Sequence, residues 1–277
     1  KIKLIKPNII FHLAAQPFVL ESFNNPIETF KTNIIGTANI VRSALLNKIK
    51  HNLIITTDKC YANNNKNLSF NENSELGGKD PYSASKACAE IITKSLADSF
   101  SQRKIYFDTV RAGNILGGGD FGKNRLIPDI YKSVIKKKKI VIRHPNAIRP
   151  WQNIFDVIFA YSLIPLNQKN RIKTFDSWNV GPNLSEKKIT VIEIVKKFLV
   201  NFEDKVIVKI KKSKINEAQI LMLNSNKIRK KLNWRNYYNL NSTIKEISQW
   251  YKLCAKKNNN KLKNFSQEIM KNYLKKI

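Results

Sequence analysis

The chain has 277 residues, of which 42% are hydrophobic, so it is long enough to bury a substantial core. No uncharged apolar run approaches the ~18 residues that a membrane span needs, and the first residues lack the long apolar core of a signal peptide. The three cysteines, Cys60, Cys88 and Cys254, lie far apart and suggest neither zinc nor a disulfide framework. These features predict a cytoplasmic protein with reduced thiols and no metal.

The formal net charge is +30. Such an excess can indicate binding to nucleic acid, because clustered Lys and Arg displace counterions from phosphates. Here the lysines are spread over almost every segment, and no helix-turn-helix, zinc or aromatic-basic pattern accompanies them. We therefore expect no nucleic-acid partner, although a basic surface favours an acidic small substrate such as a sugar nucleotide.

The first two thirds of the chain alternate between predicted strands and helices. The strands read as continuously apolar rather than alternating, which is typical of a parallel sheet covered on both faces. Their order with the intervening helices predicts an α/β protein with a doubly wound sheet. The predicted strands are 8–15, 52–57, 105–113 and 178–181, and the predicted helices are 26–48, 81–101 and 151–166.

From about residue 183 the pattern changes to that of a small second α/β lobe. An amphipathic helix is expected over 187–202, a short strand over 205–210 and another helix over 241–253. The polar, basic segment from Lys256 onward is expected to fray.

A dinucleotide-binding fold normally opens with a strand, a glycine-rich turn and a helix N-terminus. The first strand here is followed by no such turn. Gly117, Gly119 and Gly122 do match the G-x-G-x-x-G spacing, but the next strand ends in Arg143 and His144 rather than in an acid. We interpret this segment as a flexible loop that hinges over a substrate, not as a dinucleotide fingerprint.

The segment "GKDPYSASKACAE" carries the first catalytic signal. Asp80 suits an N-cap and Pro81 suits the first helical position, so a helix begins here. Tyr82 and Lys86 then lie four residues apart on one helix face. An ammonium beside a phenol favours the phenolate, which can take a hydroxyl proton while hydride leaves the same carbon. The spacing alone also suits an ordinary amphipathic helix.

The segment "NLIITTDKCY" carries the second signal, because an apolar strand ends there in Thr57, Asp58 and Lys59. Adjacent opposite charges most often form a solvated turn. At the end of a parallel strand, however, Thr57 could bond a substrate oxygen beside Tyr82, and the two charges could move protons.

In chain order, "FHLAAQ", "TNIIGT", "TTDKCY", "DPYSASK" and "RAGNILGGGD" resemble the extended short-chain dehydrogenase/reductase superfamily. Within it the chain is most similar to the CDP-glucose 4,6-dehydratase family. The likeness continues through "RLIPDI", "VIRHPNAIRPWQ" and "WNVGP" to "LNWR…ISQWY", about residues 7 to 252. It implies a partial NAD-binding Rossmann domain over 1–112, joined by the strand near 178–181, and a mostly nucleotide-sugar-binding lobe over 113–277.

The resemblance implies an NAD-dependent carbon–oxygen lyase, a hydro-lyase. It would convert CDP-D-glucose to CDP-4-dehydro-6-deoxy-D-glucose and water through transient oxidation at C4. In this scheme Thr57, Tyr82 and Lys86 serve C4, Asp58 protonates the departing C6 hydroxyl, and Lys59 assists C5 deprotonation or holds the enolate charge. Related dTDP- and GDP-sugar dehydratases carry a glutamate where Lys59 stands. Those enzymes, an epimerase of the same fold and an inactive relic are the alternatives.

The resemblance implies further contacts. The cofactor residues are Leu13, Ala14, Ala15, Thr32, Asn33, Thr56, Tyr82, Lys86, Arg111 and Ala112, and the substrate residues are Asn114, Arg125, Leu126, Ile127 and Arg149. Arg125 to Ile127 would grip the nucleotide and Arg149 would meet the diphosphate, while Asn33 could instead bridge backbone groups. Residues expected in the core or on the surface rather than at a ligand are His12, Trp151, Trp178, Trp234 and the exposed helix end Lys136–Lys139.

Compared with this family, roughly 60–75 opening residues are missing, which include the glycine-rich turn. The strand at 8–13 is then expected to present an open parallel edge. The chain is either a fragment or a decayed, shortened protein, and we expect it to bind NAD poorly. The full-length parent is expected to form a homodimer through the helices at 26–48 and 81–101, and to serve dideoxyhexose synthesis for the O-antigen of lipopolysaccharide.

Overall fold

The computed structural model describes residues 1–64, 69–167, 171–184, 188–202, 206–211 and 218–277. These residues form two compact units, each with a hydrophobic core of its own. Unit 1 comprises Lys1–Gly113, Phe159–Gly181 and Leu221–Trp234, and unit 2 comprises Asn114–Ile158, Pro182–Ile220 and Arg235–Ile277.

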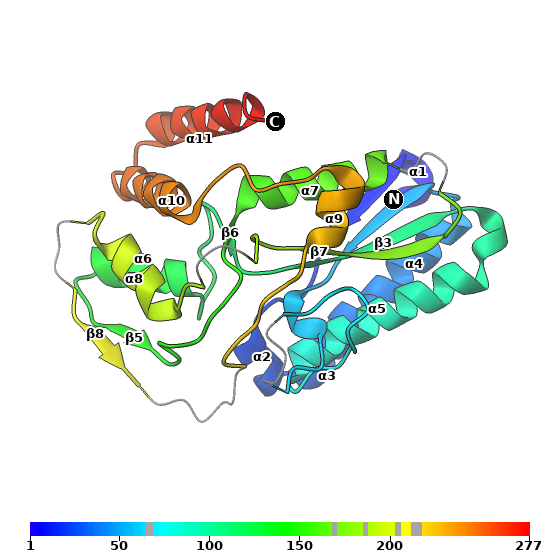
Figure 1. The fold of residues 1–277 in the computed structure, drawn as a ribbon, viewed down its shortest axis with the longest axis horizontal. Helices are drawn as coiled ribbons and strands as arrows, with labels where there is room; N and C mark the ends of the chain where they lie inside the picture. Colours follow the sequence, from blue (N-terminus) through cyan, green and yellow to red (C-terminus); the bar gives the residue numbers. More distant parts are fainter. Residues whose placement is uncertain (65–68, 168–170, 185–187, 203–205, 212–217) are drawn as a thin grey trace. The chain divides into compact units, whose positions relative to one another are not determined.

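Unit 1 is built on a four-stranded parallel sheet in the order β1-β2-β3-β7. The strands are β1 (Ile9–His12), β2 (His51–Ile55), β3 (Tyr106–Ala112) and β7 (Phe175–Val180). Helices α4 (Gly36–Leu46) and α5 (Pro81–Ser99) cover one face, and the unit 1 part of α7 (Ile154–Leu166) lies on the other (Figure 1). The predicted α/β class with a doubly wound parallel sheet is confirmed.

Apolar side chains explain why the central strands are buried. Ile54 on β2 packs with Phe107 on β3 and Val41 on α4, all three nearly or fully inaccessible. Each strand end is then fixed by the register, in which Ile55 pairs with Val110 and Arg111 pairs with Asn179. Parallel strands bring their carboxyl ends to one edge, where ligands bind in open α/β sheets.

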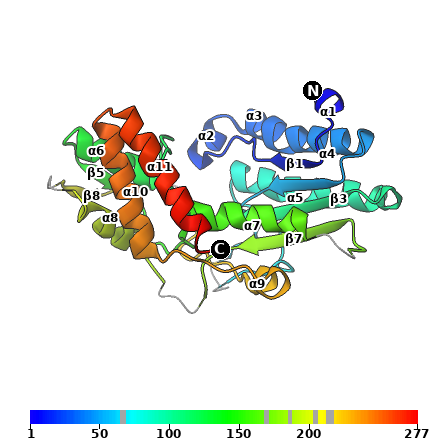
Figure 2. The ribbon, with the colours of Figure 1, turned by 90° about the horizontal axis from the view of Figure 1, so that it is seen from above.

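The strand β1 lies at an edge of the sheet, opposite β7 (Figure 2). Among the described strands it pairs with β2 alone, and Phe11 is 43% exposed. An edge strand was expected at this position, and the structure places one there.

The other elements of unit 1 are short. The predicted helix 26–48 is divided into α3, a π-helical turn and α4, and the predicted helix 81–101 is α5 followed by a 3₁₀ turn. The bounds are α1 (Ile2–Ile5), α2 (Val19–Asn24), α3 (Pro26–Phe30), η1 (Lys31–Ile35), η2 (Asp58–Cys60), η3 (Ser101–Arg103) and α9 (Asn226–Leu232).

Unit 2 packs its helices with two pairs of short parallel strands. Its core includes Ile130, Phe198, Ile244 and Tyr251, from α6, α8 and α10. The helices are α6 (Leu126–Ile135), α8 (Val191–Leu199), α10 (Leu240–Ala255) and α11 (Asn259–Leu274), and the strand pairs are β4 (Ile115–Leu116) with β6 (Gln152–Asn153) and β5 (Ile140–Ile142) with β8 (Val208–Ile210). Residues 187 and 205, the first of a predicted helix and strand, lie outside the described residues.

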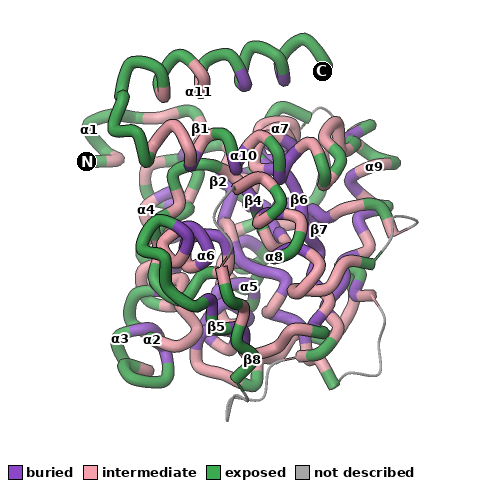
Figure 3. Tube along the Cα trace, turned by 90° about the vertical axis from the view of Figure 1, so that its left-hand side faces the viewer, coloured by how far each residue is buried: buried purple, intermediate pink, exposed green. Residues whose placement is uncertain are grey.

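The segment beyond Lys256 corrects an expectation. Instead of fraying it forms α11, whose surface is mostly exposed but which buries Ile269 and Tyr273 (Figure 3). The Tyr273 hydroxyl donates to the fully buried Asp156 over 2.9 Å and its ring stacks on Phe155. Although the segment is mostly polar, it contains two side chains that become buried, Ile269 and Tyr273, and their burial favours an ordered helix.

The unit boundaries also differ from the expected division at residue 112. Unit 1 also takes in 159–181 and 221–234, of which only the strand near 178–181 was expected to join the first domain. Trp234, as expected, is buried, and so are Trp151 and Trp178. Lys136–Lys139 are exposed at the end of α6, also as expected.

The glycine segment at 117–122 is packed within unit 2. A Cβ on Gly118 would lie 2.5 Å from the Trp250 ring, and one on Gly117 would lie 2.8 Å from Ile154. Tyr251 donates from its hydroxyl to the carbonyl of Asp120 over 2.7 Å. Close packing therefore explains Gly117 and Gly118, whereas Gly119 adopts a φ of 86° that side chains rarely tolerate. The packing of the first two glycines corrects the interpretation of this segment as a flexible loop that hinges over a substrate.

Candidate active site

The start of α5 is fixed by its own sequence, as predicted. The Asp80 side chain accepts from the Ser83 amide over 2.9 Å, and Pro81 occupies the first turn. Gly78 lets the preceding loop approach this turn, because a Cβ there would lie 2.3 Å from the Ala84 amide nitrogen. Tyr82 and Lys86, both buried, follow on the first two turns.

Lys86 is brought to the carboxyl end of β2. Its ammonium donates to the carbonyl of Ile55 over 2.8 Å, and Ile55 is the last residue of that strand. Burial lowers the pKa of Lys86 to about 8, although the Glu90 carboxylate acts in the opposite direction. This lysine can thus exchange its proton near neutral pH.

Thr57, Asp58 and Lys59 form a 3₁₀ turn directly after β2. The Thr57 hydroxyl accepts from the Lys59 amide over 3.3 Å and donates to Asp58 Oδ1 over 3.1 Å. Asp58 is only 3% exposed, whereas Lys59 is half-buried. The alternative of a solvated turn is thereby excluded for Asp58. The Thr57 hydroxyl orients the turn itself, and its contact with a substrate remains a prediction.

His12 ends β1 on the same side of the sheet. Its ring contacts the Thr37 hydroxyl at 3.3 Å, and burial together with the charge of Lys86 lowers its pKa. A neutral, half-buried imidazole agrees with the expected structural role. The parallel register pairs His12 with Ile54, so the end of β1 lies beside the end of β2, to which Lys86 bonds.

Glu90, one helical turn beyond Lys86, is not among the residues predicted from the sequence. Its carboxylate is 1% exposed and accepts from the hydroxyls of Thr56 and Thr109, each over 2.5 Å. It also forms a 2.9 Å ion pair with Arg111. The spacing Tyr82, Lys86, Glu90 is a run of i, i+4 positions on one face, and this was the signal that could have revealed it.

Arg111 extends this buried network across the sheet. Its guanidinium also donates to the Tyr61 hydroxyl over 2.9 Å, and that hydroxyl donates to Asn179 on β7 over 2.7 Å. The Asn179 backbone amide donates in turn to the Glu72 carboxylate over 2.8 Å. Burial acts to lower the pKa of Arg111, but the charge and hydrogen bond of Glu90 outweigh it and raise that pKa.

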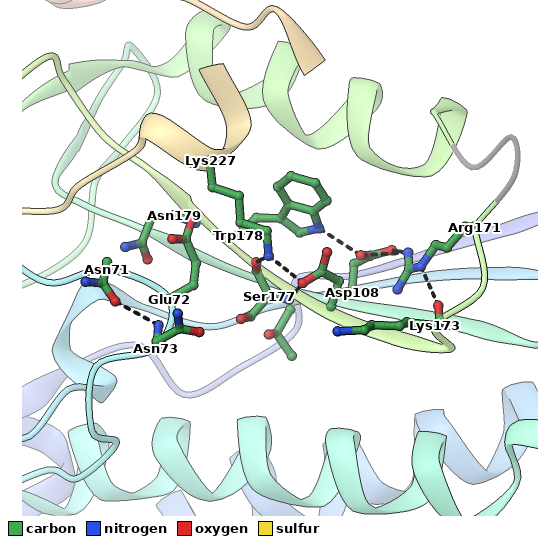
Figure 4. A network of polar contacts seen from close by, with 12 residues as sticks. Asn71, Glu72, Asn73, Asp108, Arg171, Lys173, Ser177, Trp178, Asn179 and Lys227 are labelled. Carbon is green, nitrogen blue, oxygen red and sulfur yellow. Dashed lines mark hydrogen bonds and ion pairs between the residues drawn. The ribbon is translucent and has the colours of Figure 1, made fainter. Parts of the chain in front are cut away.

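A second set of polar contacts follows β7 (Figure 4). The buried Asp108 on β3 accepts from the Arg171 guanidinium over 2.7 Å and from the Trp178 indole over 2.8 Å. Lys227 pairs with Asp176 and lies 4.5 Å above the Trp178 ring. None of these groups was predicted to act in catalysis, so Asp108 offers a buried carboxylate for comparison with Glu90.

The predicted cofactor residues fall into three environments. Leu13, Ala14 and Thr32 are exposed and Ala15 is half-buried, whereas Ala112, at the end of β3, is buried. The buried Asn33 bonds both the amide and the carbonyl of Gln16, in line with the expectation that it could bridge backbone groups, and it also donates to the Ser85 hydroxyl. The side chains of Thr56 and Arg111 bond to Glu90. Their contacts with a cofactor remain predictions.

The predicted substrate residues all lie in unit 2. Arg125 forms an exposed 3.0 Å ion pair with Asp120, and Arg149 is buried, with its guanidinium donating to the Ile148 carbonyl over 2.9 Å. Ile127 is buried, while Asn114 and Leu126 are half-buried. Their contact with a nucleotide remains a prediction.

The donors in unit 1 suit a dinucleotide. A lysine ammonium has three hydrogens, and the bond to Ile55 engages one of them. The others, with the Tyr82 hydroxyl, are chemically suited to the hydroxyls of a nicotinamide ribose. Small or apolar residues, Leu13 to Ala15, follow β1 at the edge where such ligands bind.

The described residues hold no group of three or more His, Cys, Asp or Glu side chains that could bind a metal ion. Within the same residues, no helix combines the length and the apolar character that crossing a bilayer requires.

The sequence is similar to known nucleotide-sugar enzymes. The model of the family described as GDP-mannose 4,6 dehydratase matches residues 1–247. A CDP-glucose 4,6-dehydratase of Salmonella typhimurium is 37% identical over 256 residues, which cover 89% of this chain and 71% of that protein. A UDP-glucose 4-epimerase of Mycoplasma genitalium is 27% identical over 268 residues, covering 90% of this chain and 77% of the relative.

Solved structures share the fold. A dTDP-glucose 4,6-dehydratase of Streptomyces venezuelae, crystallised with NAD, superposes with a TM-score of 0.79 at 19% identity, covering 88% of this chain and 73% of its own. MoeE5, solved with UDP-glucose and NAD, gives a TM-score of 0.81 at 15% identity, covering 90% and 80%. The chain therefore belongs to the GDP-mannose 4,6-dehydratase family, within the extended short-chain dehydrogenase/reductase superfamily that its motifs resemble.

Proposed function

We propose that this protein is a CDP-glucose 4,6-dehydratase, a hydro-lyase that forms CDP-4-dehydro-6-deoxy-D-glucose and water from CDP-D-glucose. The observation that carries the proposal is the bond between the Lys86 ammonium and the Ile55 carbonyl. It joins the Tyr-x-x-x-Lys helix to the strand end that bears Thr57, Asp58 and Lys59. The bond thereby holds the first turns of α5, with the pair Tyr82 and Lys86 proposed for oxidation at C4, against the strand end followed by the proton donors and acceptors Asp58 and Lys59.

In this reaction Tyr82 takes the proton of the C4 hydroxyl, and the Lys86 ammonium favours its phenolate. NAD, when bound, supplies a hydride acceptor for C4 and a hydride donor for C6. The resulting C4 ketone acidifies the C5 proton, and Lys59 assists its removal or stabilises the enolate. Asp58 gives a proton to the C6 hydroxyl, so that the C6–O bond breaks, water leaves and a C5=C6 double bond remains. This double bond is reduced by the hydride delivered to C6 and by a proton returned to C5, which Lys59 could supply.

The choice of CDP-glucose rests on two supports. One is the 37% identity to the Salmonella enzyme of that name. The other is Lys59 itself, at the position where the resembling dTDP- and GDP-sugar dehydratases carry a glutamate. For the nucleotide we propose contacts from Asn114, Arg125, Leu126, Ile127 and Arg149.

An activity assay with several sugar nucleotides tests this proposal. The purified chain is incubated with either CDP-glucose, dTDP-glucose, GDP-mannose or UDP-glucose and with a large excess of NAD, because weak NAD binding is expected of this chain. The 4-keto product is followed by its absorbance at alkaline pH. We expect product with CDP-glucose above all others. Conversion of UDP-glucose to UDP-galactose without a keto product would favour the epimerase alternative suggested by the Mycoplasma relative.

Three further properties belong to the proposal. We place the enzyme in the cytoplasm and its product in the dideoxyhexose synthesis that feeds O-antigen assembly.

We also propose pairing of two copies through α4 and α5. Ile35, next to α4, and Ile91 on α5 are each 55% exposed, which suits a helix-helix interface. Light scattering of the protein and of an Ile91→Glu variant would test the pairing.

A further inference from the structure

We propose that Glu90 is a positioning residue of this site, whose buried carboxylate lies one helical turn from Lys86 and ties α5 to the strand ends that carry the catalytic groups. The role in turnover rests on the proposed function. The electrostatic role toward Lys86 does not, and separate measurements distinguish the two.

The hydrogen bonds of Glu90 reach both neighbouring strands. Oε1 accepts from Thr56, the residue between Ile55 and Thr57, and Oε2 accepts from Thr109 and Arg111 on β3. Because the carboxylate bonds the residue directly before Thr57, it fixes the origin of the Thr57–Lys59 turn. Lys86 bonds Ile55, one residue further back. Two successive turns of α5 therefore hold two successive residues at the end of β2.

Glu90 is also a main source of negative charge for Lys86. The charged and titratable groups facing this pair come from three elements. His12 lies at the end of β1, Asp58, Cys60 and Tyr61 lie in or beside η2, and Arg111 lies on β3. Burial raises the pKa of the Cys60 thiol and of the Tyr61 hydroxyl, so both are neutral near pH 7. Glu90 therefore supplies the charge that opposes the desolvation of Lys86.

The neutral isostere is a direct test of this role. The substitution Glu90→Gln would keep the shape of the side chain but leave a single oxygen in place of two, and would withdraw the negative charge from Lys86. Asp108 provides the matched control, since it is an equally buried carboxylate on β3 that pairs with an arginine, Arg171. Unlike Glu90, it lies outside the interactions that affect Lys86.

The decisive measurement is the pH dependence of urea unfolding between pH 6 and 10. A lysine whose pKa is lower in the folded than in the unfolded state binds fewer protons when folded, so the free energy of unfolding rises with pH between the two values. For Lys86 that rise begins near pH 8. Subtracting the same curve for Lys86→Met isolates this contribution.

We expect Glu90→Gln to move the onset of the rise down by about one pH unit or more, a tenfold or greater change in proton affinity. Asp108→Asn is expected to lower stability without moving the onset. An unchanged onset in Glu90→Gln would overturn the proposal. If this variant does not fold because Arg111 has lost its ion-pair partner, the double variant Glu90→Gln/Arg111→Met also removes the buried positive charge. An unchanged onset in the double variant would likewise overturn the proposal.

A second measurement concerns turnover of CDP-glucose in the presence of NAD. Here Glu90→Gln is expected to shift the alkaline limb of the kcat profile to lower pH, which a purely structural role would not do. Asp108→Asn should leave that limb in place. Absence of turnover in the parent chain would contradict the proposed function, whereas the unfolding curves would still decide the role of Glu90.

Discussion

The ammonium of Lys86 lies 2.8 Å from the carbonyl oxygen of Ile55, and this contact links a helix residue to the end of a strand 31 residues earlier. It places a cation of lowered pKa at the strand end that bears Asp58 and Lys59.

Replacement of Lys86 by Met should separate activity from stability. Turnover should fall by about 10²-fold or more, because Tyr82 loses the cation that favours its phenolate. The free energy of unfolding at pH 7 should rise, because a folded-state pKa of about 8 means that burial of this charge opposes folding below the unfolded pKa. Kinetic assays and urea unfolding of the same preparations check both effects. Equal turnover in the two proteins would exclude a catalytic role for Lys86.

The pH profile of the unaltered protein gives a second prediction. Activity should decline as pH rises through about 8, because Lys86 then loses its proton and the positive charge beside Tyr82 disappears. Measuring kcat from pH 6 to 10 checks this, with the stability of the protein verified at each pH. A profile that is flat through pH 9 would contradict the assignment.

Lys59→Glu should uncouple the two halves of the reaction. Oxidation at C4 should continue, since Tyr82 and Lys86 are retained, but elimination of water should slow by a factor of about 10² or more. Reduced NAD should then accumulate and be visible in the near-ultraviolet spectrum. Full turnover without such accumulation would show that Lys59 does not take part in the elimination.

Gly78→Ala should displace the backbone at the start of α5 and thereby impair the site. Its new Cβ would lie 2.3 Å from the Ala84 amide nitrogen, so either the loop or the first turn of α5, which bears Tyr82, must move. We expect a loss of unfolding free energy of about 1–3 kcal/mol together with reduced activity. Gly77→Ala is the control, because the nearest atom to its new Cβ would be the Ala62 Cβ, at 3.3 Å. Similar behaviour of the two variants would refute this account.

Asp156→Ala should release α11. The fully buried carboxylate accepts from the Tyr237 amide and the Tyr273 hydroxyl, each over 2.9 Å, and its removal takes the acceptor away from both donors. Each such loss costs about 1–3 kcal/mol. Limited proteolysis near residue 257 should accelerate strongly. Tyr273→Phe, which removes one of these bonds, should show a smaller effect, and equal rates in all three proteins would contradict the anchoring role.

Local sequence determined much of this protein. Continuous apolar runs placed the four strands of the sheet to within a few residues, because burial on both faces leaves no polar alternation. The start of α5 was also readable, since Asp80 and Pro81 act within one turn and depend on nothing distant. Tyr82 and Lys86 were recognisable for the same reason: their spacing is a property of the helix alone.

The tertiary structure decided what depends on contacts between distant segments. Glu90 became significant only when folding placed it against Thr56, Thr109 and Arg111, which lie up to 34 residues away along the chain. The burial of Asp58 and the ordering of α11 likewise come from neighbours that no local pattern specifies. A carboxylate or a polar helix acquires its role from the groups that exclude water around it, and only the assembled fold fixes which groups those are.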